Sequence, residues 1–273
     1  MAHRLASWAT ALGKLRSGAA AALSQARDRS DLLQMELSLP PVERHLARAA
    51  LSQPDGLFHH SYHDWRARRI DKLLELYGVD YFAGRSILEL GCGHAEIGAF
   101  FADLGAHVLA VDGRAKNINY ARLRHRNVPR LQLQLIDLEG DFGALGTFDL
   151  IIHFGLLYHL RDVSAHLGRC FAMTDDMVLE TVVCDSTDPD LLILRDENAA
   201  LPEEALHGTG SRPSPFYVER LAAENGFAVE RIFSADLNSG RQFRYDWEHR
   251  NDGTPNDDLV NRRFWRFRRE AEA

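Results

Sequence analysis

Hydrophobic positions along the chain follow two different periods, and the change from one to the other marks the expected elements. Ser86–Leu90 is a short apolar run that ends in a glycine turn, which predicts a buried strand. Ala95–Leu104 follows with apolar side chains at helical spacing, which predicts a helix with one buried face. A strand, a turn and a helix in direct succession are typical of an α/β fold.

The same alternation continues toward the C-terminus. Further strands are expected at His107–Val111, Leu131–Ile136, Phe148–His153, Met177–Val183, Phe227–Phe233 and Arg263–Arg268, and helices at Asn117–Asn127 and Val163–Phe171. Because short loops join strands and helices in turn, the strands are expected to lie parallel and to be covered on both faces. The prediction is a Rossmann-like α/β fold with a seven-stranded, mostly parallel sheet and helices on both of its faces.

The segment before the first strand is expected to be a helical N-terminal extension, residues 1–80, ahead of a domain that spans 81–273. Asp64–Tyr77 carries apolar side chains on one side and predicts a helix that leads into the first strand. Met1–Arg27 has basic but no acidic residues and apolar side chains near helical spacing. We expect this helix to pack on its own domain or on a second subunit. In the second case the chain would form a homo-oligomer through this helix. A targeting sequence and a membrane-surface helix stay open as alternatives.

The alternation breaks after Asp185. Residues 186–213 are rich in proline and glycine and show no period, so we expect a mobile lid beside the functional site. Ser214 and Pro215 then suit the N-cap and the first position of a helix.

Composition narrows the function classes. The chain has 273 residues, 45% of them hydrophobic, and a formal charge of −7, which argues against a surface that follows a phosphate backbone throughout. Its three cysteines, Cys92, Cys170 and Cys184, are widely spaced and include no C-x-x-C pair, so neither a disulfide framework nor a zinc site is expected. With no apolar run long enough for a transmembrane helix, we expect a cytoplasmic protein.

The turn after the first strand carries the first candidate chemistry. It contains Gly91, Cys92 and Gly93, and glycines at the start of a helix let a ligand approach the backbone closely. A dinucleotide site would place a glycine where Glu96 stands, and a carboxylate there would repel a pyrophosphate. Glu89 lies just before the turn, where it suits a ligand that bears an ammonium group. S-adenosylmethionine, through its methionine part, is therefore favoured over NAD.

Polar residues close the next two strands as well. Asp112, with its neighbour Gly113, follows the second strand, where a carboxylate accepts ribose hydroxyls. Asp137 follows the third strand, and we expect its carboxylate, with the amide of Leu138, to bind the adenine. The fourth strand leads into Phe154–His159, and ligands of open α/β sheets bind beyond these strand ends.

Three segments of the sequence resemble those of a known enzyme family. Ile87–Gly93, Val111-Asp112 and Asp149–Leu160 are similar to the class I S-adenosylmethionine-dependent methyltransferases. Gly155–His159, with Trp65-Arg66 ahead of the first strand, resembles both the tRNA wobble-uridine carboxymethyltransferases and the small-molecule and sugar methyltransferases. The resemblance implies a cofactor site lined by Trp65, Gly93, Asp112, Asp137, Phe154 and Tyr158. The wobble-uridine enzymes hold a carboxylated cofactor with lysines, and Lys72 does not match their position, so ordinary S-adenosylmethionine is expected.

His159 and Tyr158 are the candidate catalytic residues. Imidazole titrates near neutrality, so His159 is the candidate general base, although a structural role as a helix cap stays open. Tyr158 is expected to contact cofactor or substrate, because a phenol is mostly protonated at neutral pH. His153 is ambiguous between core and site. The residues His59–Asp64 lack a clear ligand register, and no metal is expected.

The expected function is O-methylation of a small molecule or sugar. Two alternatives remain. One is a tRNA base-modifying enzyme, for which two arginine-rich stretches, residues 114–130 and 262–269, offer a nucleic-acid surface. The other is a non-catalytic partner subunit with the same fold, because fold alone does not decide function.

Overall fold

The computed structural model describes residues 60–201, 204–238, 245 and 261–270. The chain has two compact units, Met1–Pro54 and Asp55–Ala273, and the second unit holds all of the described residues. The helices expected within residues 1–59, and with them the expected subunit contact, lie outside the described residues. None of the helices in the described part is both long and apolar enough to cross a membrane.

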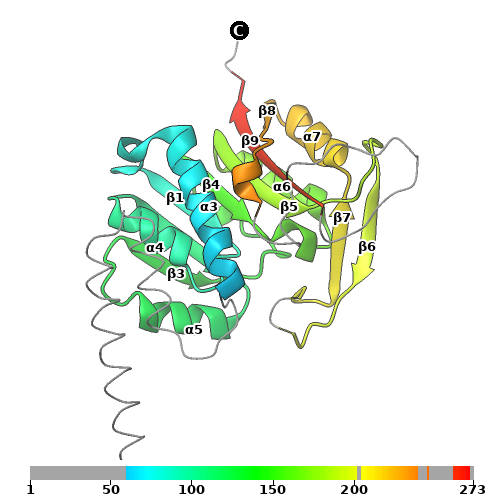
Figure 1. Cartoon of the computed structure of the whole chain (residues 1–273). Helices are drawn as coiled ribbons and strands as arrows, with labels where there is room; N and C mark the ends of the chain where they lie inside the picture. The colour runs from blue at the N-terminus through cyan, green and yellow to red at the C-terminus, as the bar shows by residue number, and fades with distance from the viewer. Residues whose placement is uncertain (1–59, 202–203, 239–244, 246–260, 271–273) are drawn as a thin grey trace, which may run out of the picture. The chain divides into compact units, whose positions relative to one another are not determined.

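Seven strands form one sheet in the order β3-β2-β1-β4-β5-β9-β8 (Figure 1). Their bounds are β1 Ser86–Leu90, β2 His107–Asp112, β3 Leu131–Leu135, β4 Leu150–Phe154, β5 Asp176–Val182, β8 Phe227–Arg231 and β9 Arg262–Arg269. Strands β1 to β5 pair in parallel, and β9 lies antiparallel to both of its neighbours. The predicted seven-stranded, mostly parallel sheet is confirmed.

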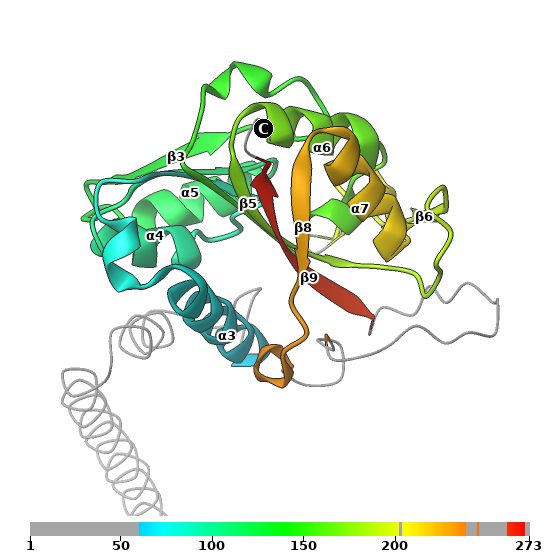
Figure 2. The same ribbon diagram turned by 90° about the horizontal axis from the view of Figure 1, so that it is seen from above.

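Helices cover both faces of this sheet. Helices α3 (His60–Tyr77), α4 (Glu96–Asp103) and α5 (Ala115–Arg124) lie on one side, and α6 (Val163–Ala172) and α7 (Pro215–Glu224) lie on the other (Figure 2). Helix α7 begins as the sequence predicts, because the Ser214 hydroxyl accepts a hydrogen bond from the Tyr217 amide at 2.9 Å. Helix α5 ends at Arg124, three residues earlier than expected.

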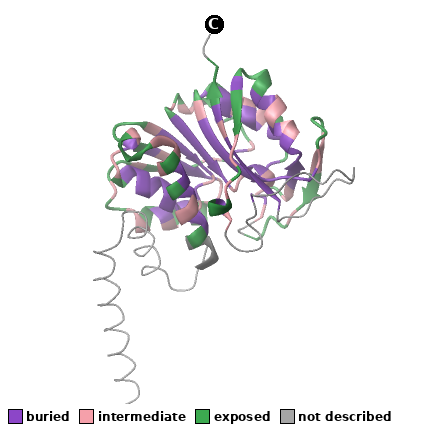
Figure 3. Ribbon diagram, turned by 45° about the horizontal axis from the view of Figure 1, so that its top comes forward, coloured by how far each residue is buried: buried purple, intermediate pink, exposed green. Residues whose placement is uncertain are grey.

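The main apolar core lies between the sheet and helices α6 and α7. Leu88 and Leu90 of β1 belong to one cluster with Leu167 of α6 and Leu221 of α7. Figure 3 shows the central strands buried along most of their length. Strands buried on both faces read as nearly continuous apolar runs, which explains why β1, β4 and β5 were recognisable in the sequence.

The segment 186–213 is not the unpatterned excursion that the sequence suggested. It folds as a hairpin in which β6 (Leu192–Asp196) pairs antiparallel with β7 (Thr209–Pro213), and the two strands form a separate sheet. Strand β7 was missed because its sequence, Thr-Gly-Ser-Arg-Pro, contains two poor strand formers. Its residues are nevertheless mostly buried, because β7 packs on the turn that follows β4.

The strand order places a crevice beside β1. From β1 the sheet extends through β2 to β3 in one direction and through β4 and β5 in the other. At such a switch point the connecting segments leave the carboxyl ends of the strands on opposite sides, and the space between them is where ligands of open α/β sheets bind.

Candidate active site

A pocket at the carboxyl ends of β1 to β4 brings together every residue that the sequence predicted for the site. These are Trp65, Glu89, Gly91, Cys92, Gly93, Asp112, Gly113, Asp137, Leu138, Phe154, Tyr158 and His159. Helix α3 supplies the first of them, and the loops after β1, β2, β3 and β4 supply most of the others. The structure therefore places all of them in one site, while the role of each stays a prediction.

The turn between β1 and α4 has no room for a side chain at Gly91. Gly91 and Gly93 have φ angles of 66° and 55°, in the left-handed region that favours glycine. A Cβ atom at Gly91 would lie 2.9 Å from the Cβ of Leu156. The turn therefore needs glycine both for its backbone conformation and for the close approach of the loop after β4. The result is bare backbone facing the pocket.

Asp112 is fixed by its own surroundings. It is buried, and its carboxylate accepts hydrogen bonds from the amides of Gly93 (2.9 Å) and Arg114 (2.8 Å) and from Asn117 Nδ2 (3.1 Å). Burial raises the pKa of Asp112 above its ordinary value, against the lowering effect of these donors. The carboxylate thus connects the glycine turn to the start of α5 and holds a fixed position at the pocket wall.

Glu89 is the second carboxylate of the pocket. Its Oε2 accepts a hydrogen bond from the Gly98 amide at 3.0 Å, within α4. Burial, together with the nearby charge of Glu96, raises the pKa of Glu89 to about 8. At neutral pH the carboxyl group of Glu89 is therefore mostly protonated as long as the pocket holds no positively charged ligand.

The pKa of Glu96 is shifted in the opposite direction to that of Glu89. Two arginines face it, Arg66 at 3.5 Å and Arg124 at 3.1 Å. Burial opposes ionisation, but the two guanidinium groups outweigh it and hold the pKa of Glu96 below its ordinary value. The repulsion that the sequence suggested between Glu96 and a phosphate is therefore weaker than expected, because the charge of this carboxylate is compensated.

Aromatic and cationic side chains form the wall on the α3 side. Trp65 lies against Gly155, whose φ is 68°, and a Cβ there would be 3.4 Å from the indole. The guanidinium of Arg69 stacks 3.9 Å from the centre of the Trp65 ring. Arg69 and Arg262 share the buried carboxylate of Glu180, at 3.4 and 2.5 Å. This buried network fixes the position of Trp65.

Tyr158 lies in the turn after β4, between two arginines. The guanidinium groups of Arg262 and Arg212 are 5.1 and 5.3 Å from the centre of its ring. Its hydroxyl oxygen accepts a hydrogen bond from Arg262 Nη2 at 3.4 Å. Its ring centre is 4.1 Å from that of His159, so the two candidate catalytic side chains lie side by side.

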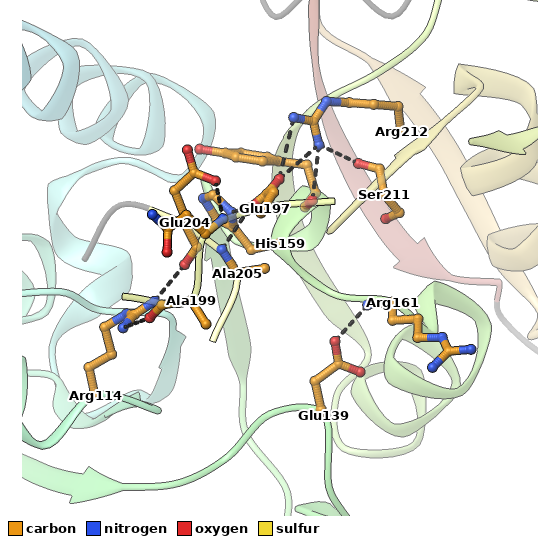
Figure 4. Close-up of polar contacts among 12 residues, drawn as sticks. Arg114, Glu139, His159, Arg161, Glu197, Ala199, Glu204, Ala205, Ser211 and Arg212 are labelled. Atoms are coloured by element: carbon orange, nitrogen blue, oxygen red, sulfur yellow. Dashed lines mark hydrogen bonds and ion pairs between the residues drawn. The ribbon is translucent and has the colours of Figure 1, made fainter. Parts of the chain in front are cut away.

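His159 has a partner that the sequence did not reveal. Its Nδ1 is 2.7 Å from Oε2 of Glu197, which follows strand β6 (Figure 4). The Glu197 carboxylate also accepts a hydrogen bond from the Ala205 amide at 2.6 Å. The helix-cap role left open for His159 is not what its side chain does here. Glu197 was missed because it is 38 residues away in the sequence, on the hairpin read as an unpatterned excursion.

The tip of the hairpin closes the opposite side of the pocket. Arg114 donates to the carbonyl oxygens of Ala199 (3.2 Å) and Glu204 (2.8 Å), as Figure 4 shows. His207 Nε2 is 2.8 Å from Oδ2 of Asp137. Leu206 packs so closely on Gly113 that a Cβ there would be 2.8 Å from its Cδ2. Leu206 and His207 of the hairpin tip therefore lie on two of the residues expected to bind the nucleoside, Gly113 and Asp137.

The chain is similar to known proteins both in sequence and in fold. A protein-family profile described as a methyltransferase domain matches residues 88–176, from β1 to the start of β5. The fold resembles the N-terminal domain of EvdMO1, solved with SAH bound, with a TM-score of 0.58 and 21% identity over 75% of this chain and 81% of that one. The chain has the fold of the class I methyltransferases, and residues 88–176 match the methyltransferase domain profile.

Two further solved structures have a similar fold. The same EvdMO1 domain, solved in the presence of SAH and D-fucose, aligns with a TM-score of 0.60 at 19% identity, over 85% of this chain and 98% of that one. Magnesium protoporphyrin IX methyltransferase from Synechocystis, with bound SAM, aligns with a TM-score of 0.53 at 15% identity, over 82% and 90% of the two chains. At these identities the likeness concerns the fold alone.

Sequence relatives are ubiquinone biosynthesis O-methyltransferases. That of Rhodopseudomonas palustris is 33% identical over 108 residues, which are 38% of this chain and 42% of the relative. That of Nitrobacter winogradskyi is 32% identical over 111 residues, 40% and 41% of the two chains. The match thus spans about two fifths of the length of these relatives.

The arginines considered for nucleic-acid binding serve the methyltransferase domain itself in several cases. Arg124 pairs with the buried Glu96, and Arg114 holds the hairpin tip. At the C-terminal end, Arg262 pairs with Glu180 and Arg266 with Asp176. Arginines that are engaged in this way are less available to the clustered basic face that a nucleic-acid groove needs.

His153 belongs to the core of the methyltransferase domain. It is fully buried, and its Nε2 is 2.8 Å from Nε2 of His166, which also lies 3.5 Å from Sγ of Cys170. Two nitrogens bound to one tetrahedral zinc ion would lie about 3.3 Å apart, given Zn–N bonds of about 2.0–2.1 Å. The shorter distance fits an N–H···N hydrogen bond between two neutral rings. Burial lowers the pKa of both histidines, that of His166 to about 4.

Proposed function

We propose that this protein transfers a methyl group from S-adenosylmethionine to a hydroxyl group of a small molecule or sugar. The observation that carries the proposal is the juxtaposition, in one pocket, of the glycine turn after β1 with the His159 side chain after β4. The similarity to O-methyltransferases over two fifths of their length supports the same reaction class.

The pocket residues fit the cofactor. The bare backbone of the glycine turn leaves room for the cofactor's amino-acid part, and Glu89 lies where the ammonium group would be. Asp112, beside Gly113, would accept the ribose hydroxyls. Asp137 and the Leu138 amide would bind the adenine, and Trp65 and Phe154 would supply apolar contacts. Each of these residues lines the pocket.

The cofactor supplies an electrophilic methyl group bonded to a positively charged sulfur. The acceptor oxygen bonds to the methyl carbon as the carbon–sulfur bond breaks, and the hydroxyl proton must go to a base. In this proposal His159 takes that proton on Nε2, because Nδ1 is already engaged by Glu197. The pocket otherwise contributes alignment of the two reactants, which by itself supplies much of the rate in reactions of this kind.

The rival functions have less support. A tRNA-modifying enzyme needs a continuous basic surface, and several of the arginines that suggested one are engaged within the domain. A non-catalytic partner subunit would have no need of a histidine held by a carboxylate beside the cofactor pocket. Both remain outcomes of the experiment that follows.

The test is formation of S-adenosylhomocysteine from S-adenosylmethionine with a panel of acceptors: 3,4-dihydroxybenzoate, D-fucose and unmodified tRNA. We expect turnover with a hydroxyl compound. We also expect His159→Ala to lower kcat by about 10²–10⁴-fold, the usual contribution of a positioned base, with cofactor affinity nearly unchanged. Leu201→Ala, at an exposed position of the hairpin, is the matched control.

The outcomes separate the three functions. Salt-sensitive binding and methylation of tRNA alone would replace the proposal with the nucleic-acid function. Cofactor binding with no product from any acceptor in the panel would favour the partner subunit. A His159→Ala variant that keeps the kcat of the parent would remove the general base and leave alignment as the source of rate.

A further inference from the structure

Glu197 reaches into the active site from an element outside the seven-stranded sheet. It follows β6, and its carboxylate meets His159 at 2.7 Å. The Glu197 side chain is only 7% exposed and that of His159 is 19% exposed. Among the described residues, no hydrogen-bond partner of His159 Nε2 is found, so Glu197 engages one ring nitrogen of a side chain that lines the pocket and the other ring nitrogen stays unengaged.

The carboxylate of Glu197 is held from several sides. Its Oε2 accepts from the Ala205 amide, and its Oε1 is 3.5 Å from the guanidinium of Arg212. Burial opposes ionisation of Glu197, but the contacts with His159, Ala205 and Arg212 outweigh it and lower its pKa. Arg212 in turn donates to the Tyr158 carbonyl at 3.1 Å. The hairpin is therefore tied to the turn that carries His159 both by a side-chain pair and by a backbone contact.

The hairpin sequence is adapted to this contact. Gly210 lies opposite Arg195 in β6 and directly beneath the Glu197 side chain. A Cβ atom at Gly210 would collide with the Glu197 carboxylate and would lie 2.5 Å from the Tyr158 carbonyl oxygen. Glycine here lets the carboxylate pack against the Tyr158-His159 turn.

We propose that Glu197 is the positioning residue of the general base, holding His159 with its proton on Nδ1 and its lone pair on Nε2. The inference rests on the proposed function. Neutral imidazole has one protonated nitrogen, and the hydrogen bond made by that nitrogen decides which one it is. A carboxylate accepts but does not donate, so it selects the Nδ1–H form. It also stabilises the imidazolium that forms when Nε2 takes the acceptor proton, and no proton moves to Glu197 itself.

The first experiment reads the tautomer directly and needs no acceptor. Long-range ¹H–¹⁵N spectra of the ¹⁵N-labelled full chain, with His159 identified by loss of its signals in His159→Gln, report which ring nitrogen is protonated. We expect the Nδ1–H form in the parent and a shift toward Nε2–H in Glu197→Ala. An Nε2–H form in the parent would overturn the proposal, because Glu197 would then have no hydrogen to accept.

The second experiment separates positioning from catalysis, with 3,4-dihydroxybenzoate or D-fucose as acceptor probe. Glu197→Gln keeps the size of the side chain and removes its charge. We expect kcat to fall by roughly 10–100-fold, as for residues that orient a functional histidine, with little change in the Kd of S-adenosylmethionine. Asp196→Asn removes the same charge from the exposed neighbouring position of β6 and should leave kcat unchanged.

The two failures are distinguishable. If His159→Ala is slow and Glu197→Gln is as fast as the parent, the positioning role is overturned and the proposed function stands. If His159→Ala is as fast as the parent, the general base itself is wrong. Slow turnover of both variants, with the cofactor Kd retained, supports the positioning role, because a hairpin that merely failed to fold would also weaken cofactor binding through Leu206.

Discussion

Glu89 accepts a hydrogen bond from the Gly98 amide while its own side chain is buried in the lining of the pocket. The contact places a carboxyl group with a pKa of about 8 against the first turns of α4. A buried group that is neutral at pH 7 and ionises beside a cation couples ligand binding to proton release.

Binding of S-adenosylmethionine should therefore release a proton from Glu89. The positive charge of the ligand favours the carboxylate and lowers its pKa in the complex, so affinity should rise with pH up to about pH 8. Calorimetry at pH 7 in two buffers of different ionisation enthalpy counts the protons. Glu89→Gln should release up to one proton fewer than the parent, and an equal count in both would contradict the assignment.

Loss of the Asp112 carboxylate should weaken cofactor binding. We expect Asp112→Ala to lower the affinity for S-adenosylmethionine by about 1–3 kcal/mol, because hydrogen bonds to a charged group are lost. Asp80→Asn, at an exposed position, is a control for charge alone. Unchanged affinity of Asp112→Ala by calorimetry would remove Asp112 from the site.

The hairpin tip should stabilise the bound cofactor. Leu206 packs on Gly113, and Leu206→Ala should cost about 1–2 kcal/mol of cofactor affinity through lost apolar contact. Leu201→Ala, 41% exposed on the same hairpin, should not. Hydrogen exchange should show residues 197–208 protected on ligand binding. Equal exchange with and without cofactor would argue against a lid.

Two glycines should respond in opposite ways to alanine. In Gly91→Ala the new Cβ would collide with Leu156, and alanine disfavours the positive φ of this position. We therefore expect a loss of stability of about 1–2 kcal/mol or more, together with loss of cofactor binding. Gly168 lies within α6 with no atom within 4 Å of its missing Cβ. Gly168→Ala should therefore raise stability by roughly 0.5–1 kcal/mol and leave binding intact. Denaturant unfolding and calorimetry check both, and a destabilised Gly168→Ala would contradict the open space described there.

The grouping of the expected cofactor residues in one pocket was predictable because each of them is marked by its position in the sequence. Glu89, Gly91, Asp112 and Asp137 each stand at or just beyond the end of a recognisable strand, and the ends of parallel strands meet at one edge of the sheet. No distance information is needed to bring them together. The order of elements alone does so, once the strands are found.

Glu197, the partner of His159, had no such marker in the sequence. Glu197 follows a short strand whose partner, β7, contains glycine and proline, and nothing local to either strand shows that they pair. The apolar run Leu191–Leu194 was the one available signal for β6. The shared burial of Arg66, Arg124 and Glu96 was also beyond the sequence, because charged residues near helices are usually solvated.

The hairpin pairs with no strand of the central sheet. Residues of its outer part can therefore be exchanged, lengthened or shortened without breaking a ladder hydrogen bond that holds the cofactor fold together. The hairpin thus brings Glu197 to His159 and Leu206 to Gly113 from an element whose strand pairing is independent of the seven-stranded sheet. A rearrangement of this hairpin would therefore alter the surroundings of His159 and leave every strand pairing of the seven-stranded sheet in place.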